Sequence, residues 1–140
     1  MSPETRAPAE LMQAFENQIG LCRELEQLAD ALPGLDRQHY LRVARIIRPL
    51  IIRSREVEEA LLFPQLVGRL SQGRALVDSI RMDQLEDEYF AEEVTDHLLL
   101  IGSGRSSLEP EAIGYMLRGF FDGIRRRIRH EQALLARLPH

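Results

Sequence analysis

The sequence is poor in the features that mark sheet-rich or disulfide-stabilised proteins. Of its 140 residues only 6% are aromatic, one is a cysteine and none is tryptophan. Few aromatics beside 44% hydrophobic and 29% charged residues favour a soluble helical domain over a sheet-rich or disordered chain. The single cysteine, Cys22, cannot form an internal disulfide, and its place between Leu21 and Leu25 predicts a buried, unreactive thiol.

Long apolar runs are also absent. Residues 1–8 lack the apolar stretch of a signal peptide, and no later stretch reaches the roughly 20 apolar residues that a transmembrane helix needs. The net charge of -4 provides no overall attraction to nucleic acid or to an anionic membrane. We therefore expect a cytoplasmic protein that binds neither nucleic acid nor membranes.

The periodicity that is present is helical, and turn residues divide the chain into four segments. Pro33-Gly34 and Gly102-Ser103-Gly104 are strong helix stops, and Asp36 is a plausible N-cap. Pro49 and Pro64 fall inside the second segment and predict kinks or a tightened last turn there. The expected helices span about residues 9–32, 36–70, 73–100 and 110–138, and residues 1–8 are expected to form a flexible tail.

Apolar residues in these segments recur at alternating spacings of four and three, the pattern of a left-handed helical bundle. Residues 9–138 are therefore expected to form one domain, an all-α, up-down-up-down antiparallel four-helix bundle. The seam of the first segment contains Leu11, Phe15, Gln18, Cys22 and Leu25. The other three seams carry polar residues in a middle layer, namely Ser54 and Glu58, Gln84 and Asp87, and Arg127 and Glu131.

Two stretches contain these polar positions. Residues 54–64 (SREVEEALLFP) and 127–135 (RIRHEQALL) each resemble a helical half-site of the hemerythrin-like (HHE) cation-binding family, in which a histidine and a carboxylate four residues later reach a shared metal centre. Residues 15–26 and 83–94 are similar to that family's first-helix and third-helix segments. The resemblance covers about residues 9–138 in the correct order and implies the same four-helix bundle.

Carried over by position, the resemblance places the family's histidine ligands on residues of other types. These former ligand positions are Phe15, Ser54, Gln84 and Arg127, while carboxylates are kept at Glu58 and Glu131. The histidines that do occur lie elsewhere in the chain. His130 precedes Glu131, but adjacent residues of a helix point about 100° apart and cannot chelate together. The resemblance therefore implies a di-iron scaffold without its imidazoles.

Loss of every imidazole removes the neutral nitrogen donors that reversible oxygen binding needs. We hypothesise that Arg127 provides a fixed positive charge in place of the metal and pairs, in bidentate fashion, with Glu58 or Glu131. The resemblance then implies a degenerate hemerythrin-like protein with no metal cofactor and no enzymatic activity. Its expected role is regulation or interaction with an unidentified protein partner, as a monomer or a homodimer.

Two alternatives stay open. Inward-facing carboxylates also hold iron or manganese in ferritin-like bundles, and Glu58, Glu88 and Glu131 could form such a site with help from Gln84. A guanidinium at Arg127 in the same layer would repel the cation. The second alternative is a small-ligand-binding bundle that uses the interior where the metals once lay.

The basic run at residues 125–130 (RRRIRH) is dense enough to suggest an anion-binding or nucleic-acid-binding site. The third segment, however, is rich in acidic residues, and sequential helices of a bundle are usually neighbours. We therefore expect an acid–base interface between the third and fourth segments. No Ser-His-Asp set, glycine-rich phosphate loop or Cys/His zinc spacing is present in the sequence.

Overall fold

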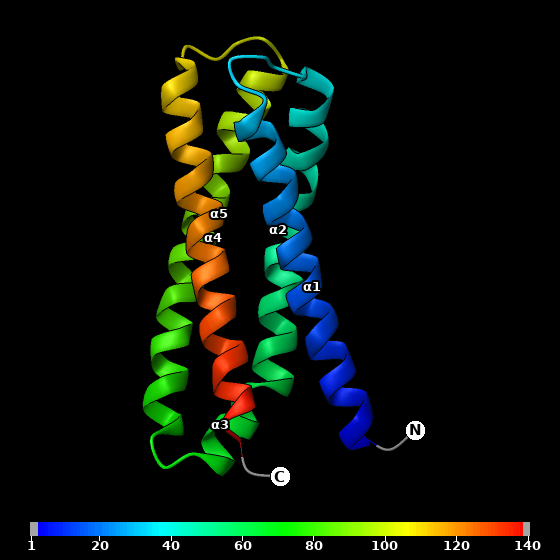
Figure 1. Ribbon diagram of the computed structural model, residues 1–140, viewed down its shortest axis with the longest axis vertical. Helices are drawn as coiled ribbons and strands as arrows, with labels where there is room; N and C mark the ends of the chain where they lie inside the picture. Colours follow the sequence, from blue (N-terminus) through cyan, green and yellow to red (C-terminus); the bar gives the residue numbers. More distant parts are fainter. Residues whose placement is uncertain (1–2, 139–140) are drawn as a thin grey trace.

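The computed structural model is an antiparallel bundle of four long helices with one short helix at one end (Figure 1). It describes residues 3–138, with side chains from residue 9 onward. The elements are α1 (Pro3–Asp30), α2 (Arg37–Leu61), α3 (Phe63–Arg69), α4 (Gly73–Gly102) and α5 (Pro110–Ala136). The expected all-α, up-down-up-down bundle is confirmed. Among residues 3–138 no helix combines the length and apolar character that crossing a membrane would require.

The four long helices form a closed ring. α1 packs against α2, α2 against α4, α4 against α5, and α5 returns to α1. Figure 1 shows the α1–α2 and α4–α5 connections at one end of the bundle and the short α3 at the other. Apolar residues that recur at spacings of four and three line the interior, and the fully buried ones include Leu25, Ile47, Leu98, Leu117 and Ile124. The spacing therefore predicted the rotation of each helix toward the core.

Two expected helix ends are formed as the sequence indicates. The side chain of Asp36 accepts a hydrogen bond from the backbone N–H of His39 at 3.2 Å and caps α2. At the end of α4, Gly104 takes a left-handed conformation with a φ of 71°. The N–H of Arg105 then donates to the carbonyl of Leu100 at 2.8 Å, which completes a Schellman-type cap.

Two boundaries differ from the expectation. α1 begins at Pro3 and ends at Asp30, whereas the sequence suggested residues 9–32; residues 1–2 lie outside the part described, and the flexibility expected of residues 1–8 stays a prediction. The expected second helix is divided at Leu62, because Pro64 lies in the first turn of α3 and has no N–H to continue the α2 hydrogen-bond ladder. Pro49, in contrast, is accommodated inside α2.

A close approach of backbones fixes the α3–α4 connection. A Cβ at Gly73 would lie 1.9 Å from the carbonyl oxygen of Leu66, so only glycine fits at this position.

Cys22 lies fully buried on α1, where its thiol donates to the carbonyl of Phe121 on α5 at 3.6 Å. Burial raises the pKa of this thiol to about 11, so the prediction of a buried, unreactive cysteine agrees with its surroundings.

Candidate functional site

A layer of polar side chains interrupts the apolar interior where the sequence placed the former ligand positions. We call it the polar layer. Its central member, Arg127, is 6% exposed, and Gln18, Glu58 and Glu131 are completely buried. Each long helix contributes: Gln18 comes from α1, Glu58 from α2, Gln84 and Asp87 from α4, and Arg127 and Glu131 from α5.

The guanidinium of Arg127 uses all three of its nitrogens. Nη1 donates to Glu131 Oε2 at 2.8 Å and lies 3.2 and 3.3 Å from the two carboxylate oxygens of Glu58. Nε donates to Asp87 Oδ2 at 2.6 Å, and Nη2 donates to Gln18 Oε1 at 2.5 Å. One side chain on α5 therefore joins α5 to each of the other three long helices.

Two glutamines orient this network. Gln84 Nε2 donates to Glu58 Oε2 at 2.6 Å, so Glu58 accepts hydrogen bonds from two helices at once. Gln18 Nε2 donates to the backbone carbonyl of Ala14 at 3.2 Å, which turns its amide oxygen toward Arg127. The amide oxygen of Gln18 thus accepts from Arg127, and the amide nitrogen of Gln84 donates to Glu58. Both charged groups therefore gain the hydrogen bonds that a buried polar network requires.

The charges of the polar layer are unequal, since one guanidinium faces three carboxyl groups. The pKa of Glu131 is raised to about 9: burial is the largest cause, the charge of Glu58 and a hydrogen bond with its carboxyl group add to the rise, and Arg127 opposes it. Burial also raises the pKa of Asp87, against the effect of Arg127. Burial opposes the charge of Arg127 itself, but Glu131, Glu58 and Asp87 together hold its pKa above the ordinary value. Glu131 is therefore protonated at neutral pH.

The hypothesised pairing of Arg127 is present, but its geometry differs from a two-nitrogen fork on one carboxylate. Nη1 contacts both Glu58 and Glu131, while Nε and Nη2 turn to other partners. Gln18 was not assigned to Arg127 from the sequence, and Asp87 was expected only as one of the acidic residues of the third segment, although both lie in the expected seams. Because both residues recur at the spacings of four and three that mark the inward faces, the sequence could have included them in the site.

Two other former ligand positions take no part in the polar layer. Phe15 is completely buried among apolar side chains of the core. Ser54, 4% exposed, lines a surface cavity with Asn17 and Val57. Neither side chain supplies a nitrogen donor to the polar layer.

Glu88, one of the carboxylates considered for iron or manganese, lies away from Glu58 and Glu131. It pairs with Arg55 of α2 at 2.6 Å. Within residues 9–138 no group of three or more histidine, cysteine, aspartate or glutamate side chains has an arrangement that could hold a metal ion. The structure therefore does not assemble the three carboxylates of that alternative.

The basic run of α5 is divided between two neighbouring helices. Arg127 meets Asp87 of α4, as the expected acid–base interface requires, but Arg125 pairs with Glu26 of α1 at 3.0 Å. Residues two positions apart on a helix point about 200° apart, and α5 lies between α1 and α4. The assignment of the whole run to the α4 interface was therefore wrong for Arg125.

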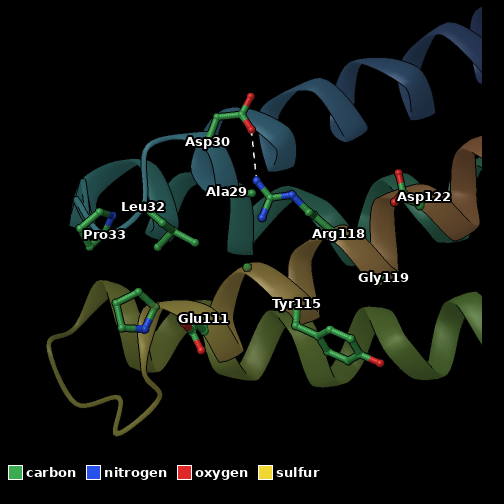
Figure 2. A pocket seen from close by; sticks show the side chains of 11 residues that line it. Ala29, Asp30, Leu32, Pro33, Glu111, Tyr115, Arg118, Gly119 and Asp122 are labelled. Atoms are coloured by element: carbon green, nitrogen blue, oxygen red, sulfur yellow. Dashed lines mark hydrogen bonds and ion pairs between the residues drawn. The ribbon is translucent and has the colours of Figure 1, made fainter.

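Two surface cavities differ in whether they reach the polar layer. The larger, of about 940 Å³, lies between the end of α1 and the start of α5, where Arg118 bridges to Asp30 at 3.3 Å (Figure 2). No member of the polar layer lines it. A cavity of about 220 Å³ reaches Asp87 and Arg127 from the surface, and its other lining residues are Asp83, Glu86, Gly123 and Arg126. Among the cavities described for residues 9–138, only this small cavity with charged walls connects the polar layer to the surface.

Comparison with known proteins provides the family. A family model described as "Hemerythrin HHE cation binding domain" matches residues 16–138, which is most of the chain. Comparison with curated proteins and with solved structures yielded no significant match. The matched span includes Glu58, Arg127 and Glu131 of the polar layer. The chain therefore belongs to the hemerythrin HHE cation-binding domain family.

Proposed function

We propose that this chain is a metal-independent member of its family that acts as a non-enzymatic regulatory or interaction protein in the cytoplasm. One observation carries the proposal: Nη1 of Arg127 lies 2.8 Å from Glu131 and 3.2 Å from Glu58. A divalent cation bridging these two carboxyl groups would need the position that the guanidinium occupies. The arginine supplies the positive charge that the fold otherwise takes from metal.

The residues at the family's cation site do not fit a metal. Glu58 is engaged by Arg127 and Gln84, and burial keeps Glu131 protonated, which makes it a weak ligand. Oε1 of Glu131 is buried and has no hydrogen-bond partner among the described residues. Because the pKa of this carboxyl group is raised, a proton on it would meet that need without a cation. We derive no metal chemistry from this site.

The same network supports a non-enzymatic role. Its polar groups are largely paired with one another, and the two that line the small surface cavity, Asp87 and Arg127, are paired with each other at 2.6 Å. A catalytic acid or base must come within hydrogen-bond reach of the proton that it moves. In the polar layer such groups hold helices together.

The metal-independent state is tested by expression with added iron and manganese, followed by elemental analysis and thermal unfolding with and without chelator. We expect a folded, metal-free protein whose unfolding midpoint the chelator leaves unchanged. Iron or manganese near one equivalent, with a midpoint lowered by the chelator, would overturn the proposal.

Two substitutions at one position show whether Arg127 is the barrier to metal. Arg127→His removes the fixed charge and restores an imidazole at the family's ligand position, so we expect Mn²⁺ or Zn²⁺ to raise the unfolding midpoint of this variant. Arg127→Met removes the charge without adding a donor and serves as the matched control. Equal metal binding by the wild-type chain and the histidine variant would contradict the argument.

The interaction role has its own measurement. A protein that copurifies with the tagged chain should bind the purified, metal-free chain equally well with and without chelator. Loss of binding in chelator would show that the interaction depends on a metal and would exclude the proposed mechanism.

A further inference from the structure

The outer face of α2 and α4 carries large apolar side chains that the bundle leaves uncovered. Ile52 is 43% exposed, Leu85 58% and Tyr89 61%, and all three line a groove of about 310 Å³ between the two helices. The floor of the groove is formed by the buried Ile51 and Ala91. Clustered exposed apolar residues with a charged rim are typical of a protein contact surface.

Charged residues border this groove in two rows of opposite sign. Arginines lie on α2 and acidic residues on α4, and the rows are joined by the pairs Arg48–Asp96 at 3.7 Å and Arg55–Glu88 at 2.6 Å. The carboxylate of Glu92 also lines the groove, and it has no ion pair or hydrogen bond within residues 9–138. The face therefore has a positive half, a negative half and an acidic group available to another molecule.

We propose that this face binds a second copy of the chain, around a two-fold axis parallel to the helices. Such an axis places α2 of one protomer against α4 of its partner at the same height. Because Arg48–Asp96 and Arg55–Glu88 already join residues of equal height, Arg55 would meet the partner's Glu88 and Arg48 the partner's Asp96. An axis perpendicular to the helices would instead oppose the two arginine rows.

The charge pattern selects a copy of the chain over a partner of uniform charge. A uniformly basic or acidic surface would meet one row of its own sign, whereas the two rows of this face complement each other after the two-fold rotation. In the dimer Ile52, Leu85 and Tyr89 are covered, and Glu92 gains the partner's arginines. Arg55 uses only Nη1 in its own pair, so its other N–H groups are available across the interface.

The inference does not depend on the proposed function, since the groove lies on the surface and contains no member of the polar layer. A metal-binding result for the interior would leave the dimer intact. A monomeric chain would likewise leave the metal-independent interior intact.

The test is the mass of the full-length chain in solution as a function of concentration, by analytical ultracentrifugation. The wild-type chain should form a dimer. Arg48→Glu with Arg55→Glu makes both rows acidic, and Glu88→Arg with Glu92→Arg makes both rows basic, so each double variant should be monomeric. Mixed in equal amounts, the two variants should form a heterodimer, because each acidic row then meets a basic one. Arg118→Glu, on the α1–α5 side, is the matched charge reversal that should leave the dimer unchanged.

Cysteine cross-linking tests the direction of the axis. Because Cys22 is buried, single cysteines at Ile52 or Glu92 report on the surface alone. Ile52→Cys mixed with Glu92→Cys should form a disulfide-linked heterodimer, and neither variant should cross-link to itself to the same extent. A wild-type chain that is monomeric at its highest soluble concentration, dimeric double variants, or self-linking of Ile52→Cys alone would each overturn the proposal. Circular dichroism of every variant confirms that it is folded.

Discussion

Ion pairs join different helices both in the polar layer and on the surface between α2 and α4, and these two regions behave differently. In the polar layer the side chain of Arg127 is 5% exposed, and every nitrogen of its guanidinium has a partner. Between α2 and α4 the pair Arg48–Asp96 is 45% and 70% exposed and spans 3.7 Å. The same chemical groups are present in both regions. Burial makes partners obligatory in the interior, whereas water screens the surface charges and leaves them available to another molecule.

The largest expected effect follows from breaking the buried region. Arg127→Ala leaves Glu58 and Asp87 without their cation, and we expect the free energy of unfolding to fall by about 3–5 kcal/mol. Urea denaturation measures this difference. Arg118→Ala removes an exposed pair with Asp30, 50% and 67% exposed, and should change stability little (Figure 2). Equal losses in the two variants would show that burial does not distinguish the ion pairs of the polar layer from exposed ones.

A smaller effect concerns the proton on Glu131. The pKa of this carboxyl is about 9 in the folded chain against an ordinary value of 4.5, so its contribution to stability is complete below pH 4.5 and is lost as the pH rises toward 9. Between pH 4.5 and neutral pH the loss amounts to about 3 kcal/mol. Glu131→Gln keeps a neutral, hydrogen-bonding group and should remove this part of the pH dependence.

Glu58→Gln is the matched control for that measurement. It removes a carboxylate paired with Arg127 and one of the causes of the raised pKa of Glu131, so it should lower stability and reduce the slope without abolishing it, because burial is the larger cause. The measurement is the free energy of unfolding from pH 5 to 9 for the wild-type chain and both variants. Unchanged pH dependence in Glu131→Gln would mean that Glu131 is ionised in the folded protein.

The smallest expected effect is the response to salt. At about 1 M NaCl the Debye length falls to about 3 Å, which screens exposed charges far more than buried ones. The stability difference between wild type and Arg127→Ala should therefore stay the same in low and high salt, and any small difference for Arg118→Ala should vanish. A salt-sensitive loss for Arg127→Ala would indicate that water reaches the polar layer.

Much of the candidate site could be predicted because helical periodicity is a local property. In the fourth segment the residues at spacings of four and three are all buried, as a bundle seam requires: Ile113, Leu117, Phe120, Ile124, Arg127, Glu131, Leu134 and Leu138. The pairing of Arg127 with Glu58 and Glu131 followed from the cost of leaving such charges unpaired. The contact with Gln18 did not follow, because it depends on the reach of a side chain across the bundle.

The sequence by itself determined the helices, their inward faces and the presence of an arginine among carboxylates, since each depends on residue type and spacing along one chain. Only the tertiary structure decided that Arg127 meets three other helices, that Arg125 turns to Glu26 and that Glu88 turns to Arg55. Those partners depend on the rotation and separation of packed helices, which arise from the whole core together.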